Sequence, residues 1–194
     1  LAPLVSEVVA CDLTESMLAA VVEQASLRGL PNIDTREAAA ESLPFQTATF
    51  DVVATRFSAH HWHAFAEGIA EMARVLKPGG LALMSDVVSP GVSLLDTWLQ
   101  TLELLRDPSH VRDASTAEWD AALAAAGLAI ERIEYFRLRL DFATWVARMN
   151  TPEPQVIAIR VLQARAASAV KDYFEMEEDG SFTVDTALFV ARKT

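Results

Sequence analysis

The chain has 194 residues, 52% of them hydrophobic and 22% charged, a composition typical of a single globular domain. Its formal net charge of −11 argues against a surface that binds nucleic acid or anionic lipid through phosphates. No stretch approaches the ~20 apolar residues of a membrane span, and the N-terminal segment lacks the basic start of a signal peptide. With Cys11 as its only cysteine, the chain forms no internal disulfide, which fits a reducing cytoplasm.

Apolar periodicity predicts strands and helices that alternate along most of the chain. Thr14, the Ser115-Thr116 pair and Asp141 are the predicted N-caps of three helices. In chain order, the predicted elements are a strand at 5–11, a helix at 15–27, strands at 32–37 and 50–54, a helix at 64–76, a strand at 81–84, helices at 94–105 and 116–126, a strand at 130–140, helices at 142–149 and 155–174, and a strand at 182–191.

The clearest supersecondary signal lies at 49–86. A buried strand precedes an amphipathic helix, which the turn Lys77-Pro78-Gly79-Gly80 ends before a second buried strand. Strand, helix and strand in this order predict a βαβ unit with parallel strands and a right-handed crossover. Because ligands bind beyond the carboxyl ends of such strands, the loops at 55–62 and 86–91 are the predicted edge of a site.

Five segments carry a family resemblance: Val8–Leu18 (VVACDLTESML), Glu41–Phe45 (ESLPF), Phe50–Val53 (FDVV), His60–Trp62 (HHW) and Glu71–Gly80 (EMARVLKPGG). In this order and spacing they resemble the class I S-adenosylmethionine-dependent methyltransferases. The resemblance is closest to the type 11 branch, which includes the ubiquinone/menaquinone C-methyltransferases. It covers the first half of the chain well and the second half in outline.

The resemblance implies an α/β fold with a doubly wound, mostly parallel Rossmann-like sheet. The last strand of that sheet runs antiparallel beside the fifth. The implied organisation is a single domain over 1–194, with its core at 1–90 and 116–194 and a helical insert or substrate cover at about 88–115. The helical segment at 141–174 is a further candidate cover.

None of the seven glycines forms the G-x-G-x-G loop that approaches the methionine part of the cofactor in this family. We therefore expect the chain to be truncated at its N-terminus, without the family's first strand and glycine loop. A central sheet without that strand is expected to have two unpaired interior edges. Such an edge makes a homodimer conceivable.

The resemblance also assigns residues to the cofactor, S-adenosylmethionine. Asp12, at the end of a strand, is implied to bond the two ribose hydroxyls, although it could instead cap the next helix. Leu13 and Met17 are implied to flank the adenine, although both are equally plausible as core residues. The adenine-contacting turn holds Ala39 and Ala40 where the family often has Asp or Asn, so backbone groups would have to read the adenine.

Arg56 occupies the family position that touches the cofactor near its methionine part, and an arginine there could hold a carboxylate bidentately. The alternative is an ion pair with Asp12 or Asp86. Glu41 is interpreted as a turn or surface residue rather than a ligand contact.

The histidines of the HHWH segment suggest either acid–base or metal chemistry. We predict no metal, because adjacent residues point apart and their loop contains no Cys, Asp or Glu. His60 or His61 is the candidate general base, since imidazole titrates near neutral pH; the alternative is a structural or capping role. Trp62 is interpreted as a pocket wall, whereas His110 and Arg112 carry no readable signal.

These features favour S-adenosylmethionine-dependent methyl transfer to a small-molecule acceptor, by resemblance an aromatic or quinone-like carbon or oxygen. Trp98 and Trp145 either pack in the core or line an apolar acceptor pocket. The alternative function is a non-catalytic binding or regulatory protein that retains the fold, which the missing glycine loop and Ala39 suggest. A nicotinamide-dependent oxidoreductase is less favoured, because Tyr135 and Tyr173 lack a suitable catalytic setting.

Overall fold

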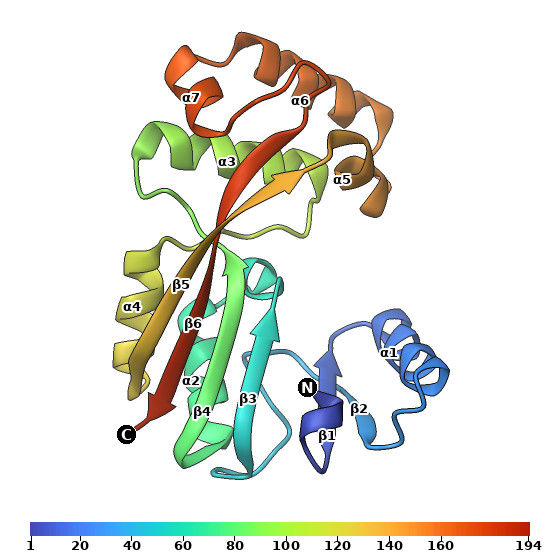
Figure 1. Ribbon diagram of the computed structural model, residues 1–194, viewed down its shortest axis with the longest axis vertical. Helices are drawn as coiled ribbons and strands as arrows, with labels where there is room; N and C mark the ends of the chain where they lie inside the picture. The colour runs from blue at the N-terminus through green and yellow to red at the C-terminus, as the bar shows by residue number, and fades with distance from the viewer.

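The computed structural model describes all residues from 1 to 194. Its strands form two sheets, with helices packed beside and above them (Figure 1). The elements in chain order are η1 (Ala2–Leu4), β1 (Val8–Asp12), α1 (Glu15–Leu27), β2 (Ile33–Glu37), β3 (Phe50–Arg56), η2 (Ala59–His61), α2 (Phe65–Val75), β4 (Leu76–Val87), α3 (Ser93–Arg106), α4 (Thr116–Ala125), β5 (Leu128–Leu140), α5 (Phe142–Arg148), α6 (Glu153–Arg165), α7 (Ser168–Tyr173) and β6 (Phe182–Lys193).

The larger sheet has the strand order β3-β4-β6-β5. β3 and β4 run parallel, whereas β6 runs antiparallel to both β4 and β5. The predicted βαβ unit and the antiparallel last strand are therefore both confirmed. The fold is α/β and Rossmann-like, as the sequence predicted.

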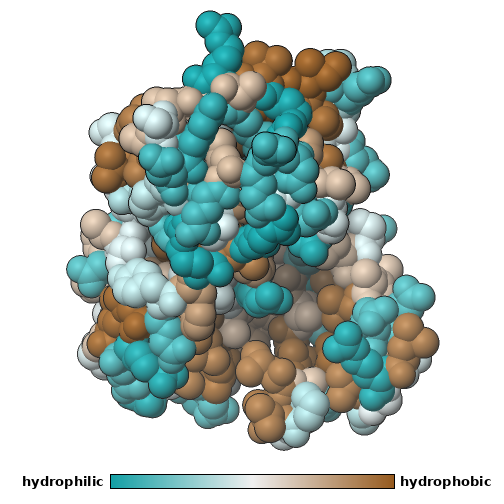
Figure 2. Space-filling model, turned by 45° about the horizontal axis from the view of Figure 1, so that its top comes forward, coloured by the Kyte–Doolittle hydropathy of each residue, from teal (hydrophilic) through white to brown (hydrophobic).

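The smaller sheet pairs β1 with β2 in parallel and is not hydrogen-bonded to the larger one. β1 and β3 are each paired on one side only, so the two predicted interior edges are present. Val52 on β3 is exposed. Figure 2 shows the surface hollowed beside the N-terminal unit, with mainly hydrophobic residues around the hollow.

Helix starts follow the capping signals in part. Ser115 and Glu118 form a complete capping box at α4, and Asp141 accepts a hydrogen bond from the Thr144 backbone N–H at α5. Thr14 occupies the N-cap position of α1, but its hydroxyl donates to Asp12 instead of capping the helix.

The structure corrects two boundaries. The predicted turn at 77–80 lies within β4, because Leu76 pairs with Phe50 and the register shifts before Val52. The predicted helix at 155–174 is two helices, since Ala166 and Ala167 are extended. No glycine or proline marks the break between α6 and α7. The break changes the direction of the chain, so that the apolar side chains of α7 are buried with those of the neighbouring helices.

Two hydrophobic cores lie along the long strands. The lower core packs α2 and α4 on the sheet and contains Ile69, Met72, Leu76, Met84, Trp119, Leu123 and Phe189. The upper core joins α3, α5, α6 and α7 to the upper part of β6 and contains Leu95, Leu99, Leu102, Trp145, Ile159, Phe174 and Phe182. Figure 1 shows β5 and β6 running through both regions. Val87 belongs to the upper core and Val88 to the lower one, so the end of β4 lies where they meet.

A substitution on α2 tests the packing of the lower core. A Cβ at Gly68 would overlap the ring of Trp62, a buried residue of this core. We expect Gly68→Ala to lower the free energy of unfolding by about 2 kcal/mol, as overpacking does. Urea titration of this variant, with Ala70→Leu on the exposed side of the helix as control, measures the effect. Equal stability of Gly68→Ala and the wild type would contradict this packing.

Candidate functional site

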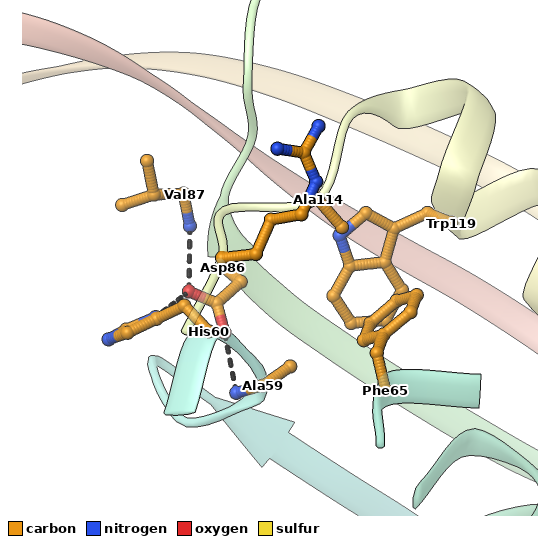
Figure 3. Close-up of a pocket in the computed structure, with 8 residues that line it drawn as sticks. Ala59, His60, Phe65, Asp86, Val87, Ala114 and Trp119 are labelled. Atoms are coloured by element: carbon orange, nitrogen blue, oxygen red, sulfur yellow. Dashed lines mark hydrogen bonds and ion pairs between the residues drawn. The ribbon is translucent and has the colours of Figure 1, made fainter. Parts of the chain in front are cut away.

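The carboxylate of Asp86 organises the site where β4 ends. Its Oδ2 accepts hydrogen bonds from the backbone N–H groups of Ser58 (3.1 Å) and Ala59 (2.9 Å). Its Oδ1 accepts from the Val87 N–H (2.9 Å) and lies 2.6 Å from Nδ1 of His60 (Figure 3). Asp86 is only 1% exposed, so its charge is stabilised mainly by these donors.

His60 is oriented by this carboxylate. A proton on Nδ1 that is donated to Asp86 leaves Nε2 with its lone pair available to a ligand. Burial by itself would lower the pKa of His60, but the hydrogen bond and negative charge of Asp86 outweigh it and raise the pKa above 6.5. Asp113 and Glu103 raise the pKa further through their charges. The His60 side chain is 14% exposed, so it remains within reach of the surface.

The loop between α3 and α4 fixes the position of η2. The backbone N–H groups of Val111 and Arg112 donate to the carbonyl of His60, at 2.8 and 3.1 Å. His61 lies over the same loop, with Nδ1 3.2 Å from the carbonyl oxygen and hydroxyl of Ser109. His60 therefore faces Asp86, whereas His61 contacts the loop between α3 and α4.

Buried acids surround His60 on the side of this loop. Asp113 is 1% exposed, and Glu103 is also buried. Burial raises the pKa of both carboxyl groups, that of Asp113 well above its ordinary value. Arg106 forms an ion pair with Glu103 at 3.1 Å and opposes the shift there. Asp113 has no such partner among the arginines and lysines.

His110 completes the buried group and remains neutral. Its Nε2 lies 2.9 Å from Oε1 of Gln100, an oxygen that also accepts from the Asp113 N–H. Burial, followed by repulsion from His60 and His61, lowers the pKa of His110 to about 4.

A narrow crevice with no room for a water molecule lies beside His60 and Asp86. Phe65 and Trp119 line it in an edge-to-face pair with ring centroids 4.7 Å apart (Figure 3). Trp62, predicted as a pocket wall, instead packs in the lower core and donates to the hydroxyl of Ser58. His63 is exposed and forms no hydrogen bond within the protein.

The predicted ribose ligand lies at the carboxyl end of β1. Oδ1 of Asp12 accepts from the N–H and hydroxyl of Thr14, at 2.9 and 2.8 Å, and Oδ2 accepts no hydrogen bond. Leu13 is 62% exposed and Met17 is 54% exposed. Both residues are therefore surface groups beside Asp12, and the interpretation of them as core residues is wrong.

Helix α2 holds the segment that follows β2 in place. Arg74 donates to the carbonyls of Leu43 (2.9 Å) and Phe45 (2.7 Å), while Glu71 accepts from the Leu43 N–H at 2.8 Å. The segment begins with Ala39 and Ala40, so their backbone groups lie on an anchored turn.

Glu41 in the same segment accepts from the Ala64 N–H at 3.2 Å. This contact ties the turn to the start of α2. Glu41 thus lies in the turn, as the sequence predicted.

Arg56, at the end of β3, makes no ion pair in the structure. Its guanidinium lies 4.7 Å from the centroid of the Phe57 ring and is exposed. The predicted alternative, an ion pair with Asp12 or Asp86, is wrong, because those carboxylates bond Thr14 and the η2 region instead.

The two tryptophans proposed for an acceptor pocket differ in their surroundings. Trp145 is buried in the upper core. Trp98 lines an open groove of about 470 Å³ between α3 and α6, together with Leu94 and Leu162. This groove shares no residue with the pocket at His60.

Sequence reasoning found His60 and the loops around it but missed the buried acids. Asp86 was recognisable as an acidic residue at the carboxyl end of a predicted strand. Asp113, Glu103 and His110 gave no such signal, because only the tertiary packing of the α3–α4 region brings them to His60.

Comparisons with known proteins agree with this fold. A family model described as a methyltransferase domain matches residues 1–84. The uncharacterized protein YafE of Escherichia coli is 47% identical over 189 residues, which cover 97% of this chain and 91% of that protein. The uncharacterized methyltransferase YcgJ of Bacillus subtilis is 34% identical over 172 residues, 89% of this chain and 68% of that protein.

The crystal structure of YcgJ matches with a TM-score of 0.94 at 32% identity, covering 99% of this chain and 84% of that one. A demethylmenaquinone methyltransferase of Chlorobaculum parvum is 35% identical over 85 residues, 44% of this chain and 33% of that protein. The fold and these relatives define a class I S-adenosylmethionine-dependent methyltransferase. Within that class, the chain belongs to the type 11 methyltransferase-domain family. None of its helices combines the length and apolar character needed to span a membrane.

The low pKa of His110 predicts a pH-dependent loss of stability. Its pKa is about 4 in the folded protein against 6.5 ordinarily, so between these values the unfolded chain binds the proton more readily. Neutral His110 therefore makes its full contribution to the free energy of unfolding above pH ~6.5. As the pH falls to ~4, this contribution decreases by about 2 kcal/mol after allowance for solvent screening.

Denaturant titrations at a series of pH values measure this effect. The variant His110→Gln removes the titrating group, and His63→Gln is the matched control at an exposed site. We expect His110→Gln alone to flatten the pH dependence between 6.5 and 4. Parallel curves for His110→Gln and the wild type would contradict the assignment.

Proposed function

We propose that the chain transfers a methyl group from S-adenosylmethionine to a small-molecule acceptor, with His60 as general base. The observation that carries this proposal is the Asp86–His60 pair, a buried carboxylate and a partly exposed imidazole at the carboxyl ends of the strands. Ligands bind at this edge in open α/β sheets. Membership in the methyltransferase family supports the reaction class.

The residues at the end of β1 fit the adenosine part of the cofactor. Oδ2 of Asp12 is an acceptor without a partner, which suits a ribose hydroxyl. The exposed Leu13 side chain offers an apolar surface for adenine. Ala39 and Ala40 would contact the adenine through backbone groups, and Arg56 has a free guanidinium for the carboxylate of the methionine part.

The bound cofactor supplies an electrophilic methyl group on a sulfonium. The protein contributes mainly proximity and orientation to such a displacement. His60 accepts a proton at Nε2 when the acceptor must lose one, and Asp86 then stabilises the imidazolium through the bond to Nδ1. His61 is a weaker candidate for this role, because its Nδ1 contacts Ser109 in the loop between α3 and α4.

A base of this kind suits an acceptor with an acidic proton, such as a phenolic hydroxyl, or an aromatic carbon that loses a proton after methylation. A quinone-like acceptor is part of this proposal, and the partial likeness to a demethylmenaquinone methyltransferase supports it. Helix α3 of the insert at 88–115, with the helical segment at 141–174, would cover the acceptor and exclude water.

We also propose a cytoplasmic location, which the free thiol of Cys11 supports. The unpaired edges of β1 and β3 would allow two copies of the chain to pair as a homodimer. The chemistry requires neither.

Transfer of a radiolabelled methyl group to a panel of phenols and quinols tests the function. We expect His60→Gln to lower kcat by about 100-fold or more near neutral pH, with KM for the cofactor unchanged. Activity of this variant is expected to recover at alkaline pH, where the acceptor ionises without a base. His63→Gln is the matched control.

Calorimetric titration of S-adenosylmethionine distinguishes the alternative function. Cofactor binding without transfer to any acceptor would favour a binding or regulatory protein with this fold. Full activity of His60→Gln would contradict the assignment of the base.

A further inference from the structure

Asp113 is a buried carboxylate without a hydrogen bond. Its backbone N–H donates to Gln100 and its carbonyl accepts from the same side chain, but its buried Oδ2 accepts no hydrogen bond and lies 3.9 Å from Nε2 of His110. Nδ1 of His110, in the same loop, is also buried and unpaired. An acceptor left unpaired in a protein interior costs ~1–3 kcal/mol, and a bound water or ion is one way in which such an atom is satisfied.

The carboxylate of Asp113 belongs to a three-residue cluster. His60, Asp86 and Asp113 each offer a ligand atom, and these atoms lie within 4.8 Å of one another. The three residues come from η2, the end of β4 and the loop before α4. Because each is fixed on a different element, the cluster depends on the fold and not on a mobile loop.

The cluster lacks a compensating cation. The nearby guanidinium of Arg106 pairs with Glu103, and that of Arg112 pairs with Asp96 and Glu118. Neither arginine contacts Asp86 or Asp113, and no lysine does. When both are ionised, the carboxylates of Asp86 and Asp113 carry a charge of −2, which a divalent cation would balance.

We propose that His60, Asp86 and Asp113 bind a single divalent transition-metal ion. One imidazole and two carboxylates form a mixed nitrogen and oxygen set, which suits Mn²⁺, Co²⁺ or Zn²⁺ better than Mg²⁺ or Ca²⁺. The ion replaces the proton on Nδ1 of His60, and the imidazole remains neutral because its proton then resides on Nε2. The unpaired carboxylate of Asp113 supplies the third ligand.

Backbone donors hold the carboxylate of Asp86 in place. Three N–H groups hold its two oxygens, so the carboxylate keeps its position when the proton is replaced. This metal site does not require the proposed methyl transfer, but it uses the same Asp86–His60 pair. With the ion on Nδ1, the neutral imidazole carries its proton on Nε2, so the role of His60 as general base belongs to the metal-free protein.

Metal binding by the full chain tests the proposal directly. Protein stripped with a chelator is titrated with Mn²⁺ and followed by electron paramagnetic resonance, and with Co²⁺ followed by visible absorption. We expect one ion per chain and binding about 100-fold weaker in Asp113→Asn. Asp107→Asn is the matched control, because Asp107 lies in the same loop and also has a buried oxygen without a partner.

A second measurement uses the wild-type protein alone. Bound Mn²⁺ is expected to broaden the imidazole resonances of His60 much more than those of His63, which is exposed. This readout keeps the proposal testable if Asp113→Asn does not fold. Failure of the wild type to bind Mn²⁺ or Co²⁺, or equal binding by Asp113→Asn and the wild type, would overturn the proposal.

Discussion

The site depends on one carboxylate and its four donors. Asp86 lies where the lower and upper cores meet, and its hydrogen bonds join the end of β4 to the start of η2. A buried carboxylate is stable only when such donors replace water. The same bonds orient His60, so the interaction that solvates Asp86 also sets which imidazole nitrogen is available for chemistry. The hydrogen bonds of Asp86 therefore both stabilise this part of the fold and orient the imidazole of His60.

The second constraint is the division of the sheet. β1 and β2 form a unit of their own, and the edges of β1 and β3 are unpaired. Asp12 and Leu13 lie on one side of that division, whereas His60 and Asp86 belong to the larger sheet. The proposed cofactor residues are thus shared between two units. The motif helix α2 connects them, since Arg74 and Glu71 bind the segment that follows β2.

Local signals predicted the order of strands and helices, the βαβ unit and the caps at Ser115 and Asp141. The sequence also led to His60, through its place in a loop after a strand and through the family motif. The break at 166–167 could not be predicted, because the buried face of α7 depends on contacts in the upper core. Asp113 and His110 were equally hidden, since packing of the α3–α4 loop against η2 brings them to the site. The sequence predicted no metal because the histidine segment contains no acidic residue. In the fold, Asp86 and Asp113 come to His60 from other parts of the chain.

The central claim is that Asp86 fixes His60 with its proton on Nδ1. Nitrogen-15 NMR of the imidazole in the metal-free protein, at a pH above the pKa of His60, tests this claim most directly. The account predicts the Nδ1–H tautomer in the wild type and a loss of that preference in Asp86→Asn. A wild-type imidazole protonated on Nε2 would contradict it, because the nitrogen assigned to the acceptor would then have no lone pair to receive a proton.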